Sequence, residues 1–313
     1  MRDSSLAAID LGTNSCRLLI ADMKGNELFK CAVPTRLGEG MSKNNCFTDE
    51  AMARGIDCLC MFKMHMDEYN VQQYRAVATA ACRMAMNGAE FVHKVKQQAN
   101  IDLEVIDGYE EARLNLLGAM ANVKDENVKY VVVYDLGGGS TEITLATKEI
   151  NPKILHTVSI PWGARNSSEK FDLNDYDAVK AEKLAEEIHK YSESFVADAK
   201  LDKYRDKLCF VATSSTPLRL THIVNDWNPY ERTRADGVVV ATQDFDRAIE
   251  NVRKMSYNER LEHSCIGQSR AEIFNAACVI FSQIYKDLKA DKIIASLKSA
   301  VDGIIMELKN GTN

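Results

Sequence analysis

The sequence has little of several features that mark special classes of protein. Only five of its 313 residues are prolines, and no proline-rich linker or low-complexity segment divides it. No apolar run is long enough to span a membrane, which argues against an integral membrane protein. Met1 to Ser5 is polar and the apolar run after it stops at Asp10, so we expect no signal peptide and a cytoplasmic location.

An excess of positive charge is also missing. The formal net charge is −6, which leaves no general attraction for nucleic acid or for an anionic membrane. The nine cysteines form no CxxC pair and the six histidines show no HxxxH spacing, so we expect neither a zinc site nor a metal–histidine site. An anionic substrate would have to be held by local groups: backbone amides, a metal ion and a few arginines.

One short pattern is present twice. Residues 7–15 read AAIDLGTNS, and residues 132–141 read VVYDLGGGST. In each, an apolar run ends at an aspartate and is followed by a turn of glycine and hydroxyl residues. Glycine lets the backbone approach a phosphate closely, and the amides of such a turn point at the anion. The predicted phosphate-binding residues are Gly12, Thr13, Asn14, Ser15, Gly137, Gly138, Gly139, Ser140 and Thr141.

The order of expected elements predicts two similar halves. Each half opens with a strand meander and continues with helices, which is a mixed α/β pattern. We expect a boundary in the polar run 124–129, with domains at 1–124 and 125–299 and a last helix at about 300–313 that packs on the first domain. This scheme describes the α/β fold of actin, sugar kinases and the Hsp70 ATPase, in which two ribonuclease H-like domains enclose a cleft.

Carboxylates accompany both turns. Asp135 ends one strand and Glu142 begins the next, so the intervening turn folds both toward one place. Two carboxylates beside a phosphate suit Mg²⁺, with Mn²⁺ as an alternative. Asp10 holds the corresponding place in the first turn and is grouped with these metal-binding acids. The alternative for Glu142 is a solvated strand residue.

A second group of charged residues lies in the first half. The segment 107–113, DGYEEAR, opens a helix on which Glu110 and Glu111 lie about 100° apart, so at most one of them faces a substrate. A carboxylate there could activate water as a general base, although acidic residues also favour helix N-termini for local reasons. Arg83 follows a strand and could clamp a phosphate oxygen, or be a surface arginine.

With these motifs, the chain resembles the exopolyphosphatase and guanosine pentaphosphate phosphohydrolase (Ppx/GppA) family nearly end to end, in its short two-domain form. The most specific segments are 8–18, 35–40, 78–88, 105–114 and 134–142. The resemblance implies hydrolysis of a terminal phosphoanhydride without a phosphoenzyme, with Glu111 as the base that orients and deprotonates water. It also implies that Arg83 faces the substrate phosphate, that Asp135 and Glu142 are metal-associated, and that the protein is a homodimer.

The sequence departs from the family pattern in two places. Residues 212–217 read ATSSTP where the family usually has a glycine-rich turn, and side chains there would narrow a nucleotide pocket. Ser299–Gly303 lacks an arginine and a glutamate that the family has, so no substrate contact is carried over to it. Arg260, Arg270 and Glu272 do fit the family, and we interpret them as mainly structural.

These observations predict a Mg²⁺-dependent exopolyphosphatase that releases the terminal phosphate of inorganic polyphosphate. Guanosine pentaphosphate (pppGpp) is the alternative substrate for the same chemistry. A sensor that binds a phosphate or nucleotide without catalysis is an alternative of another class. An ATP-dependent kinase or chaperone is disfavoured, because the glycine turn and a large substrate-binding domain are missing. A role in substrate binding for the loop 230–236 is left open.

Overall fold

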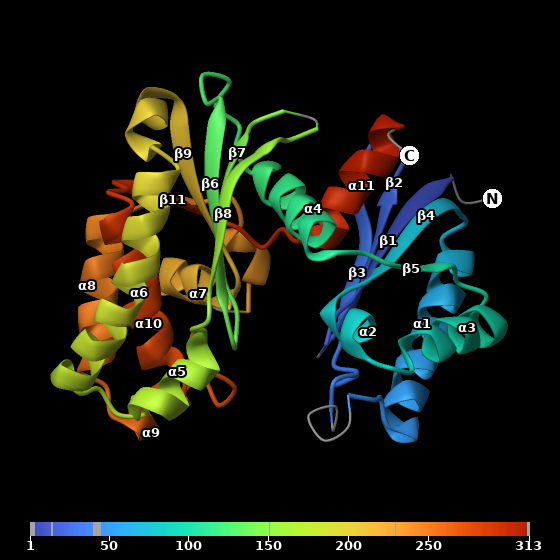
Figure 1. The fold of residues 1–313 in the computed structure, drawn as a ribbon, viewed down its shortest axis with the longest axis horizontal. Coiled ribbons are helices and arrows are strands. Elements are labelled where there is room, and N and C mark those ends of the chain that lie inside the picture. The colour runs from blue at the N-terminus through green and yellow to red at the C-terminus, as the bar shows by residue number, and fades with distance from the viewer. Residues whose placement is uncertain (1–3, 14, 40–44, 150, 229, 312–313) are drawn as a thin grey trace. The chain divides into compact units, whose positions relative to one another are not determined.

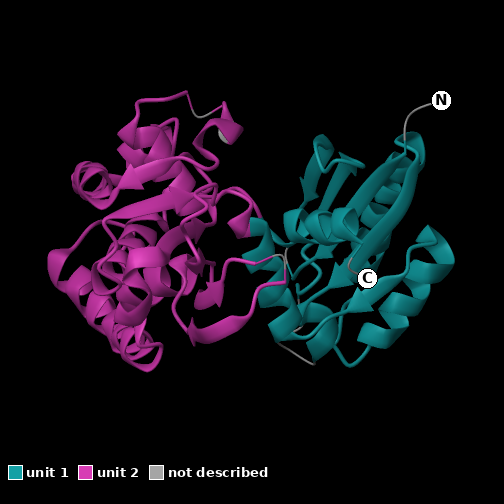
Figure 2. Cartoon of the chain, turned by 90° about the horizontal axis from the view of Figure 1, so that it is seen from above, with its two compact units in different colours: residues 1–118, 299–313 teal, residues 119–298 magenta. Residues whose placement is uncertain are grey.

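The computed structural model describes residues 4–13, 15–39, 45–149, 151–228 and 230–311. The chain forms two compact units, which we call unit 1 (Met1–Gly118 with Ser299–Asn313) and unit 2 (Ala119–Lys298; Figure 2). Each unit consists of one mixed sheet with helices packed on it (Figure 1). None of the described helices combines the length and the apolar character that a membrane crossing requires.

The sheet of unit 1 has five strands in the order β3-β2-β1-β4-β5. The strands are β1 (Ser5–Leu11), β2 (Cys16–Asp22), β3 (Glu27–Val33), β4 (Val71–Ala78) and β5 (Leu103–Val105). Strands β1, β2 and β3 form the predicted antiparallel meander, while β4 and β5 continue the sheet in parallel with β1. Every residue of β1 is buried, as its continuous apolar run predicts for a central strand.

Helices cover both faces of this sheet. They are α1 (Asp49–Glu68), α2 (Ala80–Met84), α3 (Gly88–Ala99), α4 (Gly108–Met120) and α11 (Ala300–Asn310). Because side chains alternate along a strand, Ala7 and Ile9 of β1 pack with the apolar residues of α1 and α3, whereas Leu6 and Ala8 pack with those of α4 and α11. The final helix is thus part of unit 1.

The start of α1 shows why the sequence places a helix there. The Thr48 hydroxyl accepts a hydrogen bond from the Ala51 backbone amide, with 3.2 Å between Oγ1 and N. Apolar residues then recur at helical spacing and are buried, namely Met52, Ile56, Leu59, Phe62 and Met66. The cap and the spacing together account for α1.

Unit 2 repeats the scheme with six strands in the order β10-β11-β9-β6-β7-β8. The strands are β6 (Tyr130–Leu136), β7 (Thr141–Thr147), β8 (Ile154–Ile160), β9 (Leu208–Thr213), β10 (Val239–Ala241) and β11 (Lys292–Ala295). Again the first three strands form an antiparallel meander, and β9 and β11 continue the sheet in parallel from β6. The shared order confirms the predicted repetition of one mixed α/β scheme.

The helices of unit 2 surround one large core. They are α5 (Ala164–Phe171), α6 (Ala178–Asp198), α7 (Ser215–Val224), α8 (Thr242–Arg253), α9 (Tyr257–Glu262) and α10 (Phe274–Asp287). Turns precede α10 at residues 268–273. In these turns, the Ala271 carbonyl oxygen accepts a hydrogen bond from Arg260 Nε, 3.1 Å away.

Candidate active site

The first glycine turn joins β1 to β2. The Gly12 amide donates to the Ser15 carbonyl oxygen across 3.0 Å, which closes the turn. The Gly38 amide donates to the Thr13 carbonyl oxygen across 2.9 Å and ties a neighbouring loop to the turn. A Cβ atom at Gly38 would meet the Thr13 methyl group, so a larger residue there would require the Thr13 side chain to move. Asn14, which we also expect to bind phosphate, lies outside the described residues.

The second turn joins β6 to β7 and uses the same bond. The Gly137 amide donates to the Ser140 carbonyl oxygen across 2.9 Å. The amides of Ala164 and Arg165, at the start of α5, donate to the carbonyl oxygens of Gly137 and Gly138 at 2.9 and 2.8 Å. These bonds from α5 fix the carbonyl side of the turn. The Gly137 amide is used within the turn, so an anion would meet the amides that follow it.

Two residues of the second turn have further partners. Thr141 is fully buried, and its hydroxyl donates to the Trp162 carbonyl oxygen at 2.8 Å, so this side chain supports the turn from within. The Ser140 hydroxyl donates to Glu142 Oε1 at 2.6 Å. Direct phosphate contacts by Ser140 and Thr141 stay predictions.

Asp135 and Glu142 stand directly opposite each other on β6 and β7. Opposite residues of an antiparallel pair project on the same face of the sheet, so the structure brings these two carboxylates together. Burial raises the pKa of Glu142, hydrogen bonds from Ser140 and Ser159 lower it, and the charge of Asp135 raises it further. A hard divalent cation bound here would offset the repulsion of the two carboxylates.

The available carboxylates suit Mg²⁺ better than a metal that is bound entirely by protein side chains. Among the described residues, no group of three or more His, Cys, Asp or Glu side chains is arranged to hold a metal. Mg²⁺ is usually bound through one or two carboxylates, with water and substrate phosphate completing its shell. Asp135 and Glu142 supply that number.

Asp10 has a different environment. It is 7% exposed, and its Oδ2 lies 3.2 Å from Nη1 of Arg17, which stands opposite it in the β1–β2 pair. Burial raises the pKa of Asp10 and the charge of Arg17 lowers it. The cation beside Asp10 is therefore Arg17, a residue of the same unit. The sequence did not predict this pairing. A role for Asp10 in metal binding stays a prediction.

The structure distinguishes the two adjacent glutamates of α4. Glu110 lies 2.7 Å from Arg113 Nε and 2.9 Å from Arg75 Nη2, and these pairs lower its pKa to about 2. Glu111 instead has its Oε2 3.1 Å from Nη1 of Arg83, and both of these side chains are about one-third exposed. Of the two predicted alternatives, Glu110 is held in a structural ion-pair network, whereas Glu111 meets the other candidate catalytic residue.

Arg83 is oriented by the backbone before α4. Its Nη1 donates to the Ile106 carbonyl oxygen at 2.6 Å as well as to Glu111. Asp107 accepts from the Glu110 amide at 2.8 Å and so caps the start of α4. The end of β5 and the start of α4 thereby position the carboxylate and the guanidinium together in unit 1.

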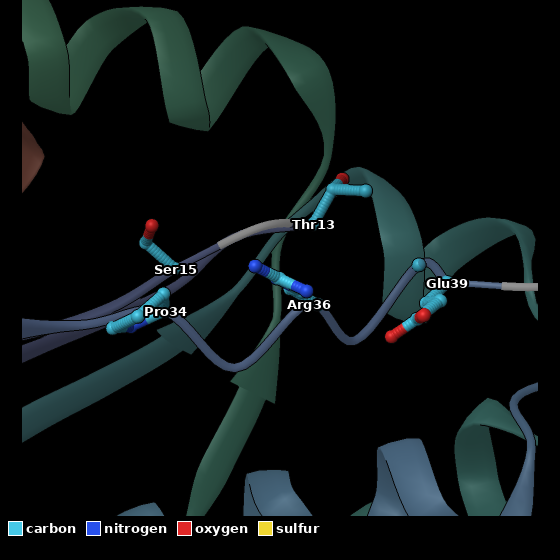
Figure 3. A pocket seen from close by; sticks show the side chains of 6 residues that line it. Thr13, Ser15, Pro34, Arg36 and Glu39 are labelled. Atoms are coloured by element: carbon cyan, nitrogen blue, oxygen red, sulfur yellow. The ribbon is translucent and has the colours of Figure 1, made fainter. Parts of the chain in front are cut away.

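A pocket of about 430 Å³ opens beside the first glycine turn (Figure 3). The residues that line it are Thr13, Ser15, Pro34, Arg36, Gly38 and Glu39. Thr13 and Ser15 were expected to bind phosphate. Arg36 lies in a segment that resembles the family, for whose side chains the sequence predicts no role.

The turn after β9 keeps the backbone of a glycine turn without having a glycine. Ser214 has φ of 87° and ψ of 179°, a combination that is almost restricted to glycine. Thr213 before it pairs with Asp135 across β9 and β6. Ser214 thus directly follows the strand position that pairs with Asp135. A narrowed nucleotide pocket at this turn stays a prediction.

Arg260 is a structural residue, as expected. Its side chain is fully buried, and its guanidinium donates to the carbonyl oxygens of Met255, Asn174 and Ala271. Together with an ion pair between its Nη2 and Asp175 Oδ1, 3.5 Å apart, these contacts join α9 to the segments before α6 and α10.

The repeated meanders and glycine turns place the molecule in the class of actin-like α/β proteins. Residues 19–310 match the Ppx/GppA phosphatase family. The structure is similar to that of a Ppx/GppA phosphatase from Aquifex aeolicus, with a TM-score of 0.83 and 25% identity over 97% of this chain and 99% of that one. It is also similar to an exopolyphosphatase from Cytophaga hutchinsonii, with a TM-score of 0.77 and 25% identity over 99% of both chains.

A curated relative extends the comparison. Over 179 residues, 54% of this chain, the sequence is 34% identical to a bifunctional 3-dehydroquinate synthase/phosphatase of Fusobacterium nucleatum. The match spans about a quarter (26%) of that longer protein. The chain belongs to the Ppx/GppA phosphatase family, and it is accordingly a phosphoanhydride hydrolase.

Proposed function

We propose that the chain is an exopolyphosphatase that hydrolyses the terminal phosphoanhydride bond of inorganic polyphosphate. The observation that carries this proposal is the contact between Glu111 and Arg83, 3.1 Å apart in unit 1. It combines a carboxylate able to take a proton from water with a cation able to bind a phosphate oxygen.

In the proposed reaction, Arg83 binds an oxygen of the terminal phosphate and Glu111 orients a water molecule toward phosphorus. The water oxygen bonds to phosphorus as the bridging P–O bond breaks, and the shortened chain leaves with the electron pair. The proton of the water passes to Glu111. Catalysis of this kind depends on positioning and charge stabilisation, so the glycine turns and the arginine supply most of it.

The proposed reaction uses Mg²⁺, and Mn²⁺ would bind the same ligands. Asp135 and Glu142 would hold the ion from unit 2, where their opposite positions supply two hard oxygen ligands. When bound, the ion would offset negative charge on the phosphate oxygens. The acidic chain cannot do this through its net charge, which is −6.

Polyphosphate is favoured over pppGpp by the turn at Ser214. A side chain where the family usually has glycine narrows the space in which a nucleoside would have to fit. Guanosine pentaphosphate presents the same kind of terminal bond and is the substrate to compare. The cytoplasmic location, the homodimer and the absence of nucleic-acid and membrane partners stay predictions.

The test is phosphate release from long-chain polyphosphate and from pppGpp in parallel, each with Mg²⁺ and with a chelator. We expect faster release from polyphosphate and loss of release with the chelator. Preference for pppGpp would contradict the substrate assignment. Tight binding of either compound without release would contradict catalysis and indicate a sensor.

A further inference from the structure

The pocket beside the first glycine turn has the chemistry of a phosphate site. Two hydroxyl groups, of Thr13 and Ser15, and the guanidinium of Arg36 line it. Figure 3 shows the Arg36 side chain between those of Ser15 and Thr13. None of the six described residues that line the pocket is aromatic, so it offers no ring on which a base could stack.

The backbone at Arg36 is held in an unfavourable conformation by its neighbours. Its φ is 47°, in the left-handed region that favours glycine. Arg54 of α1 donates from Nε to the Thr35 carbonyl oxygen at 2.9 Å and from Nη2 to the Arg36 carbonyl oxygen at 3.2 Å. Leu37 is fully buried in the core with α1 and α3. These contacts fix the backbone and leave the Arg36 side chain exposed at the pocket.

The charges of the pocket also favour an anion. Glu39 lines the pocket, but its Oε2 lies 2.8 Å from Arg54 Nη2, so its charge is already offset. Across the described ranges of the chain, no ion pair involves the Arg36 guanidinium. The left-handed backbone of Arg36 also lies beside a predicted binding turn, and backbone strain of this kind clusters at functional sites.

We propose that Arg36 binds a phosphate group of the substrate in this pocket, together with the hydroxyls of Thr13 and Ser15. The subsite deepens the proposed exopolyphosphatase function and rests on it for the identity of the substrate. A guanidinium donates two parallel hydrogen bonds to phosphate oxygens, which a lysine cannot do with the same geometry. Because Arg36 acts on substrate binding, its replacement is expected to raise KM more than it changes kcat.

The test compares Arg36→Gln, Arg36→Lys and Arg36→Gly with the unchanged chain. Arg247→Gln is the matched control, since it removes one exposed arginine of α8 that pairs with Asp244. With polyphosphate, we expect Arg36→Gln to raise KM about tenfold or more, with a smaller change in kcat. Arg36→Lys should raise KM less than Arg36→Gln does. Arg247→Gln should leave KM within about twofold of the value for the unchanged chain.

Folding and function are separated by Arg36→Gly. Glycine adopts the left-handed conformation without strain. The thermal unfolding midpoint of Arg36→Gly should therefore equal or exceed that of the unchanged chain, while its KM for polyphosphate rises. A raised KM accompanied by a lower unfolding midpoint in all three variants would overturn the proposal, because it would indicate a structural role.

Calorimetric binding of inorganic tripolyphosphate distinguishes this subsite from the proposed reaction. If the unchanged chain binds tripolyphosphate about tenfold more tightly than Arg36→Gln but releases no phosphate from any substrate, the subsite stands and the proposed function fails. If hydrolysis proceeds and neither KM nor binding changes in Arg36→Gln, the subsite is wrong and the proposed function stands.

Discussion

Glu110 and Glu111 are adjacent in the sequence and differ in their partners. Glu110 is 23% exposed and bonds to Arg113 and Arg75, which also bond to Glu307 of α11. Glu111 pairs with Arg83. The sequence predicted that at most one of these two residues acts as the base, because adjacent residues point to different sides of a helix. Helical spacing alone could not select between them, since the contacts that distinguish them come from arginines of β4 and α2; the resemblance to the family implied Glu111.

Glu110 should stabilise unit 1 in a pH-dependent way. Its pKa is lowered to about 2 in the folded chain from an ordinary value of 4.5. Its contribution is therefore fully present above about pH 4.5 and is lost as pH falls toward 2. We expect Glu110→Gln to lower the free energy of unfolding by about 1–3 kcal/mol at pH 7. In urea titrations, this difference should shrink as pH falls below 4.5, and an equal difference at pH 7 and pH 3 would contradict the account.

Ser214 shows how a single residue can retain a conformation that its type disfavours. Residues 212–217 contain no glycine, yet the backbone at Ser214 adopts a conformation that is almost exclusive to glycine. The sequence predicted that side chains would enter this turn. It could not predict that the backbone would keep its course, because the surrounding strand and helix determine it.

At the scale of elements, β6 and β7 place two carboxylates in opposite positions. Like charges directly opposite each other destabilise a strand pair by roughly 0.2–1 kcal/mol. We expect Glu142→Gln to raise the unfolding midpoint of the metal-free protein slightly, because it relieves this repulsion and because burial disfavours the Glu142 charge.

The same variant should lose stabilisation by metal. Adding Mg²⁺ should raise the unfolding midpoint of the unchanged chain, since an ion that binds only the folded state stabilises it. It should not raise that of Glu142→Gln. Equal shifts in both proteins, measured by calorimetry with and without Mg²⁺, would show that Glu142 does not hold the ion.

Helices α4 and α11 are packed too closely for side chains at two positions. A Cβ atom at Gly118 would meet the Ser299 carbonyl oxygen, and one at Gly303 would meet the Leu114 carbonyl oxygen. The block Ser299–Gly303, which departs from the family pattern, is thus a packing segment in this chain. Lys30 supports it as well, with its Nζ 3.0 Å from Asp302 Oδ2.

Gly303→Ala should therefore destabilise the protein by about 2 kcal/mol, because the backbones of α4 and α11 must separate. Gly108→Ala is the control, since a Cβ atom at Gly108 has no heavy atom within 4 Å. Chemical denaturation measures both. A Gly303→Ala variant as stable as the Gly108→Ala variant would contradict the close packing.

The elements differed in how well the sequence predicted them. The two meanders and their turns were predicted, because apolar strands ending at Asp-Leu-Gly are local signals. The shared bond from Gly12 to Ser15 and from Gly137 to Ser140 follows from that repetition. The pairing of Asp10 with Arg17 and the pocket at Arg36 were missed, because both depend on which strands and loops become neighbours.

At the scale of the whole molecule, the chain consists of two units that repeat one scheme. Unit 1 is completed by residues 299–313, which return from the far end of the sequence. Glu307 of α11 bonds to Arg75 and Arg113, so the last helix supports the helix that carries Glu111. Glu111 and Arg83 belong to unit 1, and Asp135 and Glu142 belong to unit 2.

The most direct test of this account is the turnover of Glu111→Gln, with Glu90→Gln as the control for loss of an exposed carboxylate. Glu90 pairs with Lys94 on α3. With polyphosphate and Mg²⁺, we expect kcat of Glu111→Gln to fall about 10²-fold or more while substrate binding is retained, because only the activation of water is lost. Turnover equal to that of Glu90→Gln would contradict the assignment of Glu111 as the base.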